Sequence, residues 1–415
     1  MNKYFVSCIA GLSLTGALIA SENLYTIGPA FNAPAVDDES SESLPINWNV
    51  GADFTYDDNL LPGSPADQDS FGISPYISAG FLSVGPQTTI DIFARLGMVY
   101  YFDAPAGMDD TNSSSKLHLN IKHEISERVS FATKNHIAYE LEPNYAYGYA
   151  SSRQGQEHLY WMTDNSLGYR WTERLGTSTG VKLSGLQYQD VSNQDRTTWQ
   201  LYNQFRYVLT PQSIATFDYR YGVTTADGIA SDSTNQFILA GIEHRFSPNT
   251  VGTFKAGVQI RDVDKGDSAS SPYFEGSVQS QVNEQFRVRA FTRYGIESYD
   301  TVQSFATAPG GLVEYDERNT MRFGLSSNYR ISPFLTFFSG VDYITTSYES
   351  GRIVASGNSF GDSEEDFITA HVGLSYQLKE GLTGTATYTY TGSNSDIANR
   401  TYDRNRISVG INSEF

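Results

Sequence analysis

Residues 286–294 have the sequence FRVRAFTRY, in which mostly apolar side chains at even numbers alternate with three arginines at odd numbers. Residues 320–330, TMRFGLSSNYR, have the same texture with the apolar side chains at odd numbers. A period of two is typical of a β-strand, because successive side chains point to opposite faces of the sheet. Each segment is therefore predicted to be a strand with one apolar and one polar face.

The same alternation runs from residue 46 to the end of the chain, in segments of about 9 to 14 residues. In residues 199–209, for example, aromatic and aliphatic side chains share one face, and glutamine and arginine share the other. A soluble sandwich would turn the apolar faces into a core. A transmembrane barrel would turn them to lipid and the polar faces to a wet lumen. Periodicity alone does not distinguish these two folds.

The connections between the segments do distinguish them. Eight are short, and all but one of them, 172–174, contain the Pro, Gly, Asn or Ser typical of tight turns: residues 83–87, 126–128, 172–174, 210–212, 247–249, 283–284, 332–334 and 379–381. Nine longer ones alternate with them, near residues 57–69, 103–115, 142–156, 189–195, 225–232, 262–271, 298–315, 349–363 and 393–402. Short periplasmic turns and long external loops are typical of outer-membrane barrels. We therefore predict an all-β fold, a single transmembrane antiparallel up-and-down β-barrel of about 18 strands, with about 16 as the alternative.

The end of the chain agrees with this prediction. One face of the last segment, which we expect to meet lipid, carries Ile407, Val409, Ile411, Ser413 and Phe415. A final strand that ends in an aromatic residue resembles the signal by which the barrel-assembly machinery recognises outer-membrane proteins. Phe415 is accordingly predicted to be an assembly signal. An even number of strands places both chain ends on the periplasmic side.

The segments before residue 46 are not expected to belong to the barrel. Residues 1–20 combine Lys3 with an apolar run and are predicted to be a secretory signal peptide. Residues 21–45 are polar and acidic, and we expect a flexible periplasmic lead-in there; residues 46–415 form the barrel. The one cysteine, Cys8, lies in the signal peptide, so disulfides and cysteine-ligated metals are excluded from the mature chain.

Composition narrows the function further. The formal net charge of −19 argues against a nucleic-acid partner, because phosphate would repel the chain. Aromatic residues make up 13% of the sequence, which suits the aromatic belts at membrane–water interfaces. Nothing resembles a nucleophile elbow or a helical metal motif, so we predict no enzyme activity and no cofactor.

The polar faces supply candidate pore-lining residues. The position of a residue in the alternation determines which face it lies on. The residues assigned in this way to the polar face include Arg95, Arg206, Arg220, Lys255, Arg287, Arg289, Arg293, Arg322, Asp218 and Glu275. The predicted wall is of mixed charge and slightly basic, while acidic residues gather in the predicted external loops, at 57–69 and 362–366. The densest basic patch combines Arg287, Arg289 and Arg293 with Arg318, Arg322 and Arg330. These arginines either favour the passage of anions or pair with Glu275 and Glu297 to keep the lumen solvated.

Three further features each have a functional and a structural interpretation, and we favour the structural one. Five aromatic residues are assigned to the lumen face by the alternation. They could form a line along which sugar rings slide, or simply fill the wall; they are Tyr101, Tyr160, Tyr202, Phe291 and Phe338. His118 is expected to lie directly across from His136 on the lumen face. The two side chains could be metal ligands, or they could be neighbours by chance. The acidic loops could bind divalent cations that bridge lipopolysaccharide, or be solvated.

Residues 50–60, VGADFTYDDNL, look like the opening strand of the β-barrel porin type 2 family, whose first strand ends in an aromatic-Asp-Asp/Ser-Asn-aliphatic stretch, here Tyr56 to Leu60. This resemblance implies an outer-membrane barrel in a family to which transport is attributed, and it carries over no site residue.

Together these features predict a bacterial outer-membrane, porin-like channel for passive, weakly selective diffusion of small hydrophilic solutes. The alternative is a non-conducting barrel with a structural, adhesion or exopolysaccharide-export role. The expected partners are outer-membrane lipid and lipopolysaccharide, the barrel-assembly machinery and small polar solutes. Assembly into a homo-oligomer is left open.

Overall fold

A computed structural model describes residues 46–61, 68–105, 108–141, 157–189, 195–264, 266, 268–298, 301–305, 308, 311–397 and 399–415. The predicted signal peptide and lead-in lie outside the described residues. The strands are β1 (Asn47–Asp57), β2 (Ser70–Val84), β3 (Thr88–Tyr101), β4 (Thr111–Glu124), β5 (Val129–Glu140), β6 (His158–Arg170), β7 (Leu175–Tyr188), β8 (Arg196–Thr210), β9 (Ser213–Ala226), β10 (Ser233–Ser247), β11 (Thr250–Val263), β12 (Ala269–Gln281), β13 (Phe286–Ile296), β14 (Val302–Ser304), β15 (Leu312–Ser332), β16 (Leu335–Ile353), β17 (Ser359–Phe360), β18 (Ser363–Lys379), β19 (Leu382–Ser395) and β20 (Tyr402–Glu414). No helix among these residues is long and apolar enough to cross a membrane.

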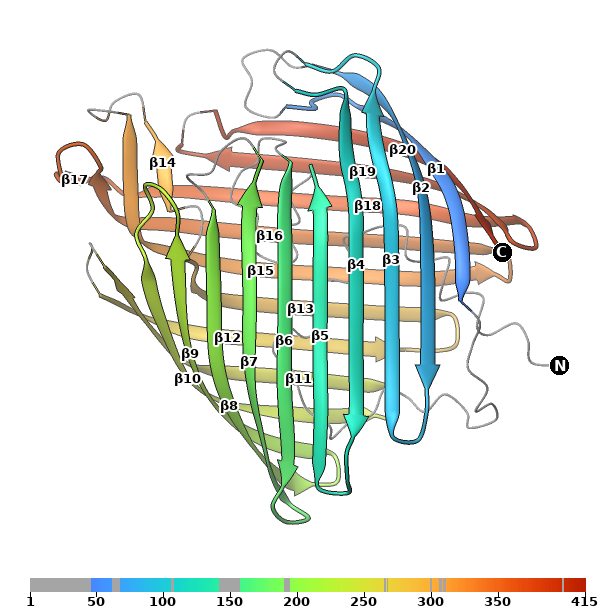
Figure 1. Ribbon diagram of the computed structural model, residues 1–415. Coiled ribbons are helices and arrows are strands. Elements are labelled where there is room, and N and C mark those ends of the chain that lie inside the picture. The colour runs from blue at the N-terminus through green and yellow to red at the C-terminus, as the bar shows by residue number, and fades with distance from the viewer. Residues whose placement is uncertain are drawn as a thin grey trace.

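The strands form one closed antiparallel barrel (Figure 1). The sheet has 20 strands; β14 and β17 are short additions in two of the connections, which leaves 18 strands in the wall. Each wall strand pairs with the next, and β1 pairs with β20 to close the ring. Closure leaves no sheet edge in the wall, so the backbone groups of every wall strand have partners on both sides. The predicted fold class is confirmed.

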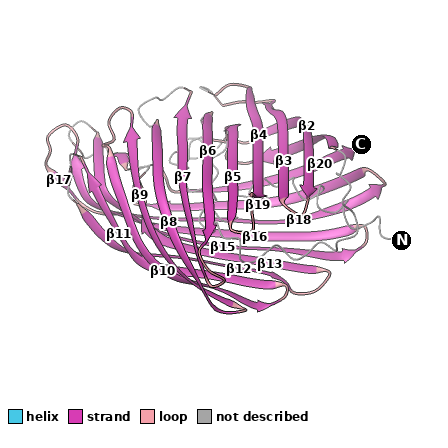
Figure 2. Cartoon of the chain, turned by 60° about the horizontal axis from the view of Figure 1, so that its bottom comes forward, coloured by secondary structure: helices cyan, strands magenta, loops and turns pink. Residues whose placement is uncertain are grey.

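The two ends of the barrel differ in their connections. The eight predicted tight turns are all present, from Gly85–Gln87 between β2 and β3 to Glu380–Gly381 between β18 and β19. The strand ends that flank the longer connections lie at the opposite end, and β1 begins and β20 finishes at the tight-turn end (Figures 1 and 2). This arrangement confirms the predicted sorting of connections by length.

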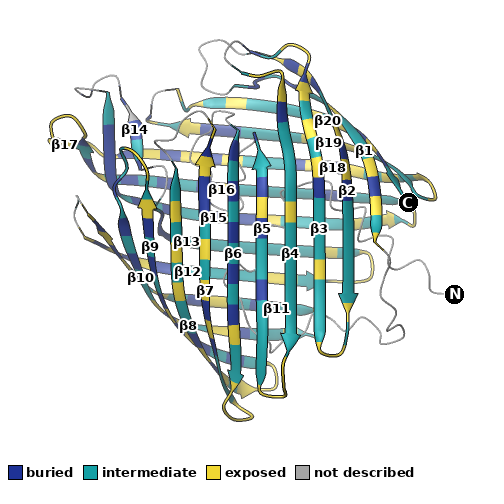
Figure 3. Cartoon of the chain, viewed as in Figure 1, coloured by how far each residue is buried: buried dark blue, intermediate teal, exposed yellow. Residues whose placement is uncertain are grey.

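The wall is apolar outside and polar inside, as β8 illustrates. Trp199 and Leu201 are exposed on its outer face, whereas Gln204 and Arg206 on its other face are only 3% and 6% exposed. The predicted lipid-facing residues of β20 follow the same rule, since Ile407 and Val409 are more than half exposed. Exposed and buried residues alternate along many wall strands (Figure 3). A soluble protein distributes its side chains the other way round.

The seam between the first and last strands is fastened by charged groups. Asp57, at the end of β1, is 1% exposed. Its carboxylate accepts hydrogen bonds from Nε and Nη2 of Arg404 and from Nε of Arg406. Asp58 accepts bonds from the backbone and side-chain amides of Asn405, at 2.6 and 2.7 Å. Asn59 donates to the carbonyl of Asp403 at 2.9 Å.

This seam corrects one prediction. Asp57 was expected among the solvated acids of an external loop, but it ends a strand and is buried. The motif that resembles the porin family therefore packs against the last strand. The acidic run at 362–366 is corrected at one residue, because β18 begins at Ser363 and Glu365 is 2% exposed beside Arg400, whereas Asp362, Glu364 and Asp366 are exposed. In both cases the partner is an arginine distant in sequence.

The β15–β16 hairpin extends beyond its neighbours at the long-connection end. Pairing with β13 ends at Asn319, but β15 continues to Leu312 and β16 continues to Ile353. The predicted loops 298–315 and 349–363 are therefore partly strand. The sequence Ser350-Gly351 looks like a turn, and Ser350 does have φ of 57°. Gly351 nevertheless stays in the ladder opposite Tyr315, and the Tyr315 ring lies 2.8 Å from the place where a Cβ would stand, so the position suits glycine.

A small apolar cluster caps this extension. It joins residues of the β13–β15 and β19–β20 connections to the hairpin, and Phe360 of β17 packs against it. Its members are Phe305, Ala308, Val313, Tyr315, Tyr348, Ile353 and Ile397. The cluster orders the long connections on one side of the barrel mouth.

Candidate functional site

Long charged side chains from β8 to β12 meet in the barrel interior. Arg206 on β8 forms a two-point ion pair with Glu243 on β10, and both are buried. Lys255 on β11 reaches back to Asp218 on β9, at 3.1 Å. Arg220 on β9 contacts Glu275 on β12, at 2.7 Å. Contacts between strands that are not neighbours require all these side chains to point inward.

We call these six residues the central ion-pair network. Its three cations and three carboxylates cancel, so the network carries no net charge. Lys255 and Arg220 are 1% and 3% exposed, so their charges are shielded from the solvent of the lumen. Buried charges of this kind must be paired to be tolerated. The network therefore accounts for five predicted pore-lining residues as parts of a packed wall.

A second group of charges lies nearer the long-connection end. Glu297, just after β13, accepts bonds from Arg293 at 2.5 Å, Arg318 at 2.7 Å and Arg322 at 2.8 Å. We call these four residues the arginine cluster. Three guanidinium groups share one carboxylate, so the four side chains together carry two excess positive charges.

The predicted basic patch is thus divided by the structure. Arg293, Arg318 and Arg322 converge on Glu297, as the pairing interpretation expected. Arg287 lies towards the tight-turn end, where its Nε donates to Gln281 at 2.9 Å. Arg289 lies between them on β13, opposite Gln279. Glu275 was expected to pair with this patch, and instead it receives Arg220 and Lys255.

Arg95 lies on the other side of the barrel. It contacts Asp53 at 3.4 Å, and its guanidinium lies 3.7 Å from the centre of the Tyr76 ring. Tyr76 receives a hydrogen bond from Asn412 on the last strand. Arg95 therefore belongs to the packing beside the seam.

The predicted aromatic residues do not form a line. Tyr101, Tyr160, Tyr202, Phe291 and Phe338 lie on β3, β6, β8, β13 and β16, of which no two are adjacent in the wall. Tyr202 donates to Asp164 at 2.7 Å, and Tyr160 packs with Met162 and Leu186. These positions favour the interpretation that the aromatic side chains fill space along the inner side of the wall.

The histidine pair has the predicted register. His118 on β4 lies directly opposite His136 on β5, and their Nδ1 atoms are 3.0 Å apart. At this distance one imidazole donates a hydrogen bond to the other. Within the described ranges no group of three or more His, Cys, Asp or Glu is placed to hold a metal ion.

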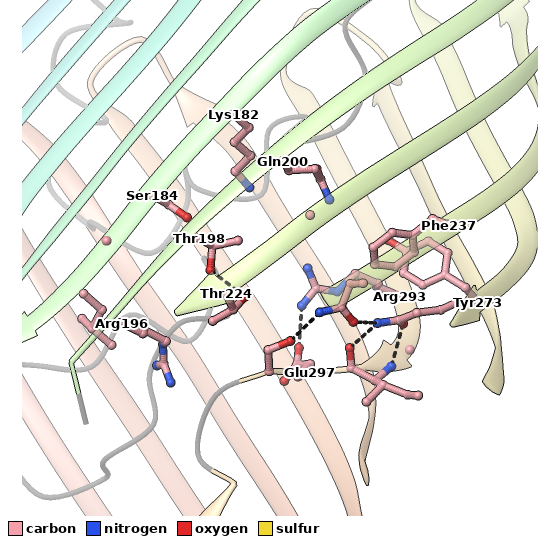
Figure 4. A pocket seen from close by; sticks show the side chains of 18 of the residues that line it. Lys182, Ser184, Arg196, Thr198, Gln200, Thr224, Phe237, Tyr273, Arg293 and Glu297 are labelled. Atoms are coloured by element: carbon pink, nitrogen blue, oxygen red, sulfur yellow. Dashed lines mark hydrogen bonds and ion pairs between the residues drawn. The ribbon is translucent and has the colours of Figure 1, made fainter. Parts of the chain in front are cut away.

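A cavity of about 180 Å³ lies beside the arginine cluster, against β6 to β13 at their long-connection ends (Figure 4). The charged residues that line it are Lys182, Arg196, Arg293 and Glu297. Three aromatic residues, Tyr160, Phe237 and Tyr273, and several hydroxyl and amide side chains complete the lining. The alternation in the sequence predicted Arg293 as a pore-lining residue. It did not predict Arg196, because this residue precedes the clearly alternating part of β8.

Comparisons with known proteins give structural likeness only. No protein-family model matches the chain, and none of the curated proteins matches it. OccAB4 of Acinetobacter baumannii is 13% identical, with 90% of this chain and 100% of that chain covered and a TM-score of 0.45. OpdK of Pseudomonas aeruginosa, determined with vanillate, is 10% identical, with 89% and 99% covered and a TM-score of 0.45. The siderophore receptor PirA of P. aeruginosa is 10% identical, with 90% and 81% covered and a TM-score of 0.42.

Proposed function

We propose that this chain is an outer-membrane channel through which small hydrophilic solutes diffuse passively and with weak selectivity. The observation that carries the proposal is the closed wall with an apolar outer face and a charged inner face, most plainly in β8. Lipid would surround the outer face, and water would wet the inner one. A barrel of this strand number usually encloses an aqueous channel.

The sidedness of the barrel sets its orientation. Short turns would face the periplasm, and the long connections would face the lipopolysaccharide. Phe415 would then lie at the periplasmic rim, where the barrel-assembly machinery acts, and its 77% exposure suits recognition by a partner. Residues 1–20 would direct export.

Planar-bilayer recording of the purified protein tests the channel. We expect discrete current steps after insertion, in a preparation whose folding is verified by heat-modifiable migration on gels. A folded barrel that gives no steps would contradict the proposal. Swelling of liposomes in neutral sugars would then show whether slower passage persists.

One observation favours the alternative of a barrel without an open pore. The central ion-pair network buries Lys255 and Arg220 almost completely, so the interior is densely packed near β9 and β11. A structural, adhesion or exopolysaccharide-export role would fit a barrel packed in this way throughout. The absence of current steps combined with normal folding would support this alternative.

A further inference from the structure

The cavity beside the arginine cluster lies at the mouth of the barrel that solutes from outside would meet first. Its volume, about 180 Å³, is roughly ten times what one water molecule requires. The cavity is therefore large enough for a small solute.

The charge of the lining is positive. Lys182, Arg196 and Arg293 face the cavity together with a single acid, Glu297. Asp164 lies opposite Lys182 in the wall, which offsets that lysine. Glu297 is already shared with Arg318 and Arg322. The lining therefore holds more cationic than acidic side chains, and guanidinium groups match the geometry of carboxylate and phosphate oxygens.

The uncharged lining suits hydroxyl groups. Lys182 and Gln200 point into the cavity across from Arg293, and Ser184 and Thr198 lie on the same side (Figure 4). Thr198 shares a hydrogen bond with Thr224 at 2.9 Å, and the hydroxyl pair still offers lone pairs. These groups come from β7, β8 and β9, so they form a continuous polar surface.

The third component is aromatic. Phe237 and Tyr273 stand edge to face with ring centres 5.0 Å apart, next to Arg293 in Figure 4. Tyr273 is held in place because its hydroxyl donates to Glu275 at 2.7 Å. The C–H face of a sugar ring packs well against such fixed aromatic surfaces.

From these three components we propose that the cavity is a binding subsite for small hydroxylated oxyanions, that is, sugar carboxylates or sugar phosphates. This proposal names a solute class for the channel function and rests on it for its biological meaning. Arg293 and Arg196 bind the anionic group, Gln200 and Ser184 bind ring hydroxyls, and the Phe237–Tyr273 pair supports the ring. Binding at the mouth raises the local concentration of such solutes without closing the channel to others.

Calorimetric titration of the folded protein in detergent tests the subsite with four probes. Glucuronate and glucose 6-phosphate should bind, and their relative affinities distinguish the carboxylate from the phosphate. Glucose lacks the anionic group and benzoate lacks the hydroxyls, so each should bind at least about tenfold more weakly. Equal affinity for glucose and glucuronate would overturn the proposal, and so would equal affinity for benzoate and glucuronate.

Two variants assign the roles of the residues. Arg293→Gln should weaken glucuronate binding by about tenfold or more, since a charge-assisted contact is lost. Gln200→Leu should weaken binding of glucuronate more than binding of benzoate. Arg174→Gln is the matched control, because it removes the same charge from an exposed tight turn at the other end of the barrel. Equal effects of Arg293→Gln and Arg174→Gln would overturn the assignment.

Titration does not depend on conduction, so the two proposals fail separately. A barrel without current steps that binds glucuronate would refute the channel and keep the subsite. A conducting barrel that does not bind glucuronate or glucose 6-phosphate would keep the channel and refute the subsite.

Discussion

Asp57 shows how much one side chain can determine in a closed barrel. It is buried, its carboxylate receives two arginines of the last strand, and its Oδ1 also accepts the backbone amide of Asn59 at 3.1 Å. The bond to Asn59 turns the chain out of β1, and the bonds to Arg404 and Arg406 hold the first and last strands together. The residue therefore ends a strand and fastens the seam at once.

We expect Asp57→Asn to destabilise the barrel by about 3 kcal/mol, because Arg404 and Arg406 would lose the buried carboxylate that pairs with both of them. The loss should appear as a lower temperature at which the folded band disappears on gels. Asp103→Asn is the control, since Asp103 is exposed in the β3–β4 connection. An unchanged transition in Asp57→Asn would refute a fastening role for this carboxylate.

At the level of the strands, the tight turns determine the register of the wall. Gly381, between β18 and β19, has φ of 72°, a left-handed conformation that disfavours a side chain. A Cβ there would also stand 2.9 Å from the carbonyl oxygen of Glu414 on β20. The turn therefore needs glycine both for its backbone angle and for the close approach of the last strand.

Gly381→Ala should cost about 1 kcal/mol or more, because strain in the turn adds to the contact with β20. The matched control is Gly80→Ala in β2, where nothing lies within 4 Å of the added Cβ. Urea unfolding in lipid vesicles would compare the two. Equal midpoints for both variants would contradict the argument from the turn.

The sequence predicted these elements well wherever local patterns determine them. Alternation located the wall strands, and short polar interruptions of it, six of the eight with Pro, Gly or Asn, located the tight turns, because both signals lie within a few neighbouring residues. The extension of β15 and β16 was missed because Ser350 and Gly351 suggest a turn, whereas Gly351 pairs with Tyr315 across the hairpin. Likewise, Asp57 and Glu365 looked like solvated loop acids, since their arginine partners are far away in sequence.

The interior of the whole molecule was predicted only in outline. Parity placed Arg206, Arg220 and Lys255 inside, but their partners depend on which strands curve towards each other. Arg220 on β9 reaches Glu275 on β12, three strands away, and no local pattern specifies such a pair. Cross-lumen contacts follow from barrel closure and side-chain length, so they appear only in three dimensions.

Phe415 connects the finished barrel with its assembly. Its backbone amide donates to the carbonyl of Trp48 at 2.8 Å, whereas its ring is largely exposed. Because the ring packs little in the folded state, Phe415→Ala should lower the amount of folded protein in membranes several-fold but barely change the stability of refolded protein. Gel migration of both preparations measures this. Phe334→Ala is the control, because Phe334 is also exposed but lies in the tight turn between β15 and β16. If both variants lost the same amount of folded protein in membranes, a specific signal at Phe415 would be refuted.

The balance of charge across the interior should determine which ions pass. The central ion-pair network is neutral, whereas the four side chains of the arginine cluster carry two excess positive charges near the mouth. Glu297→Gln raises that excess by one charge, and we expect a stronger preference for chloride over potassium. The reversal potential in a KCl gradient measures the preference, and the shift should shrink at high salt because screening shortens the reach of the field. A channel whose reversal potential stays constant in Glu297→Gln would mean that ions pass out of range of the arginine cluster.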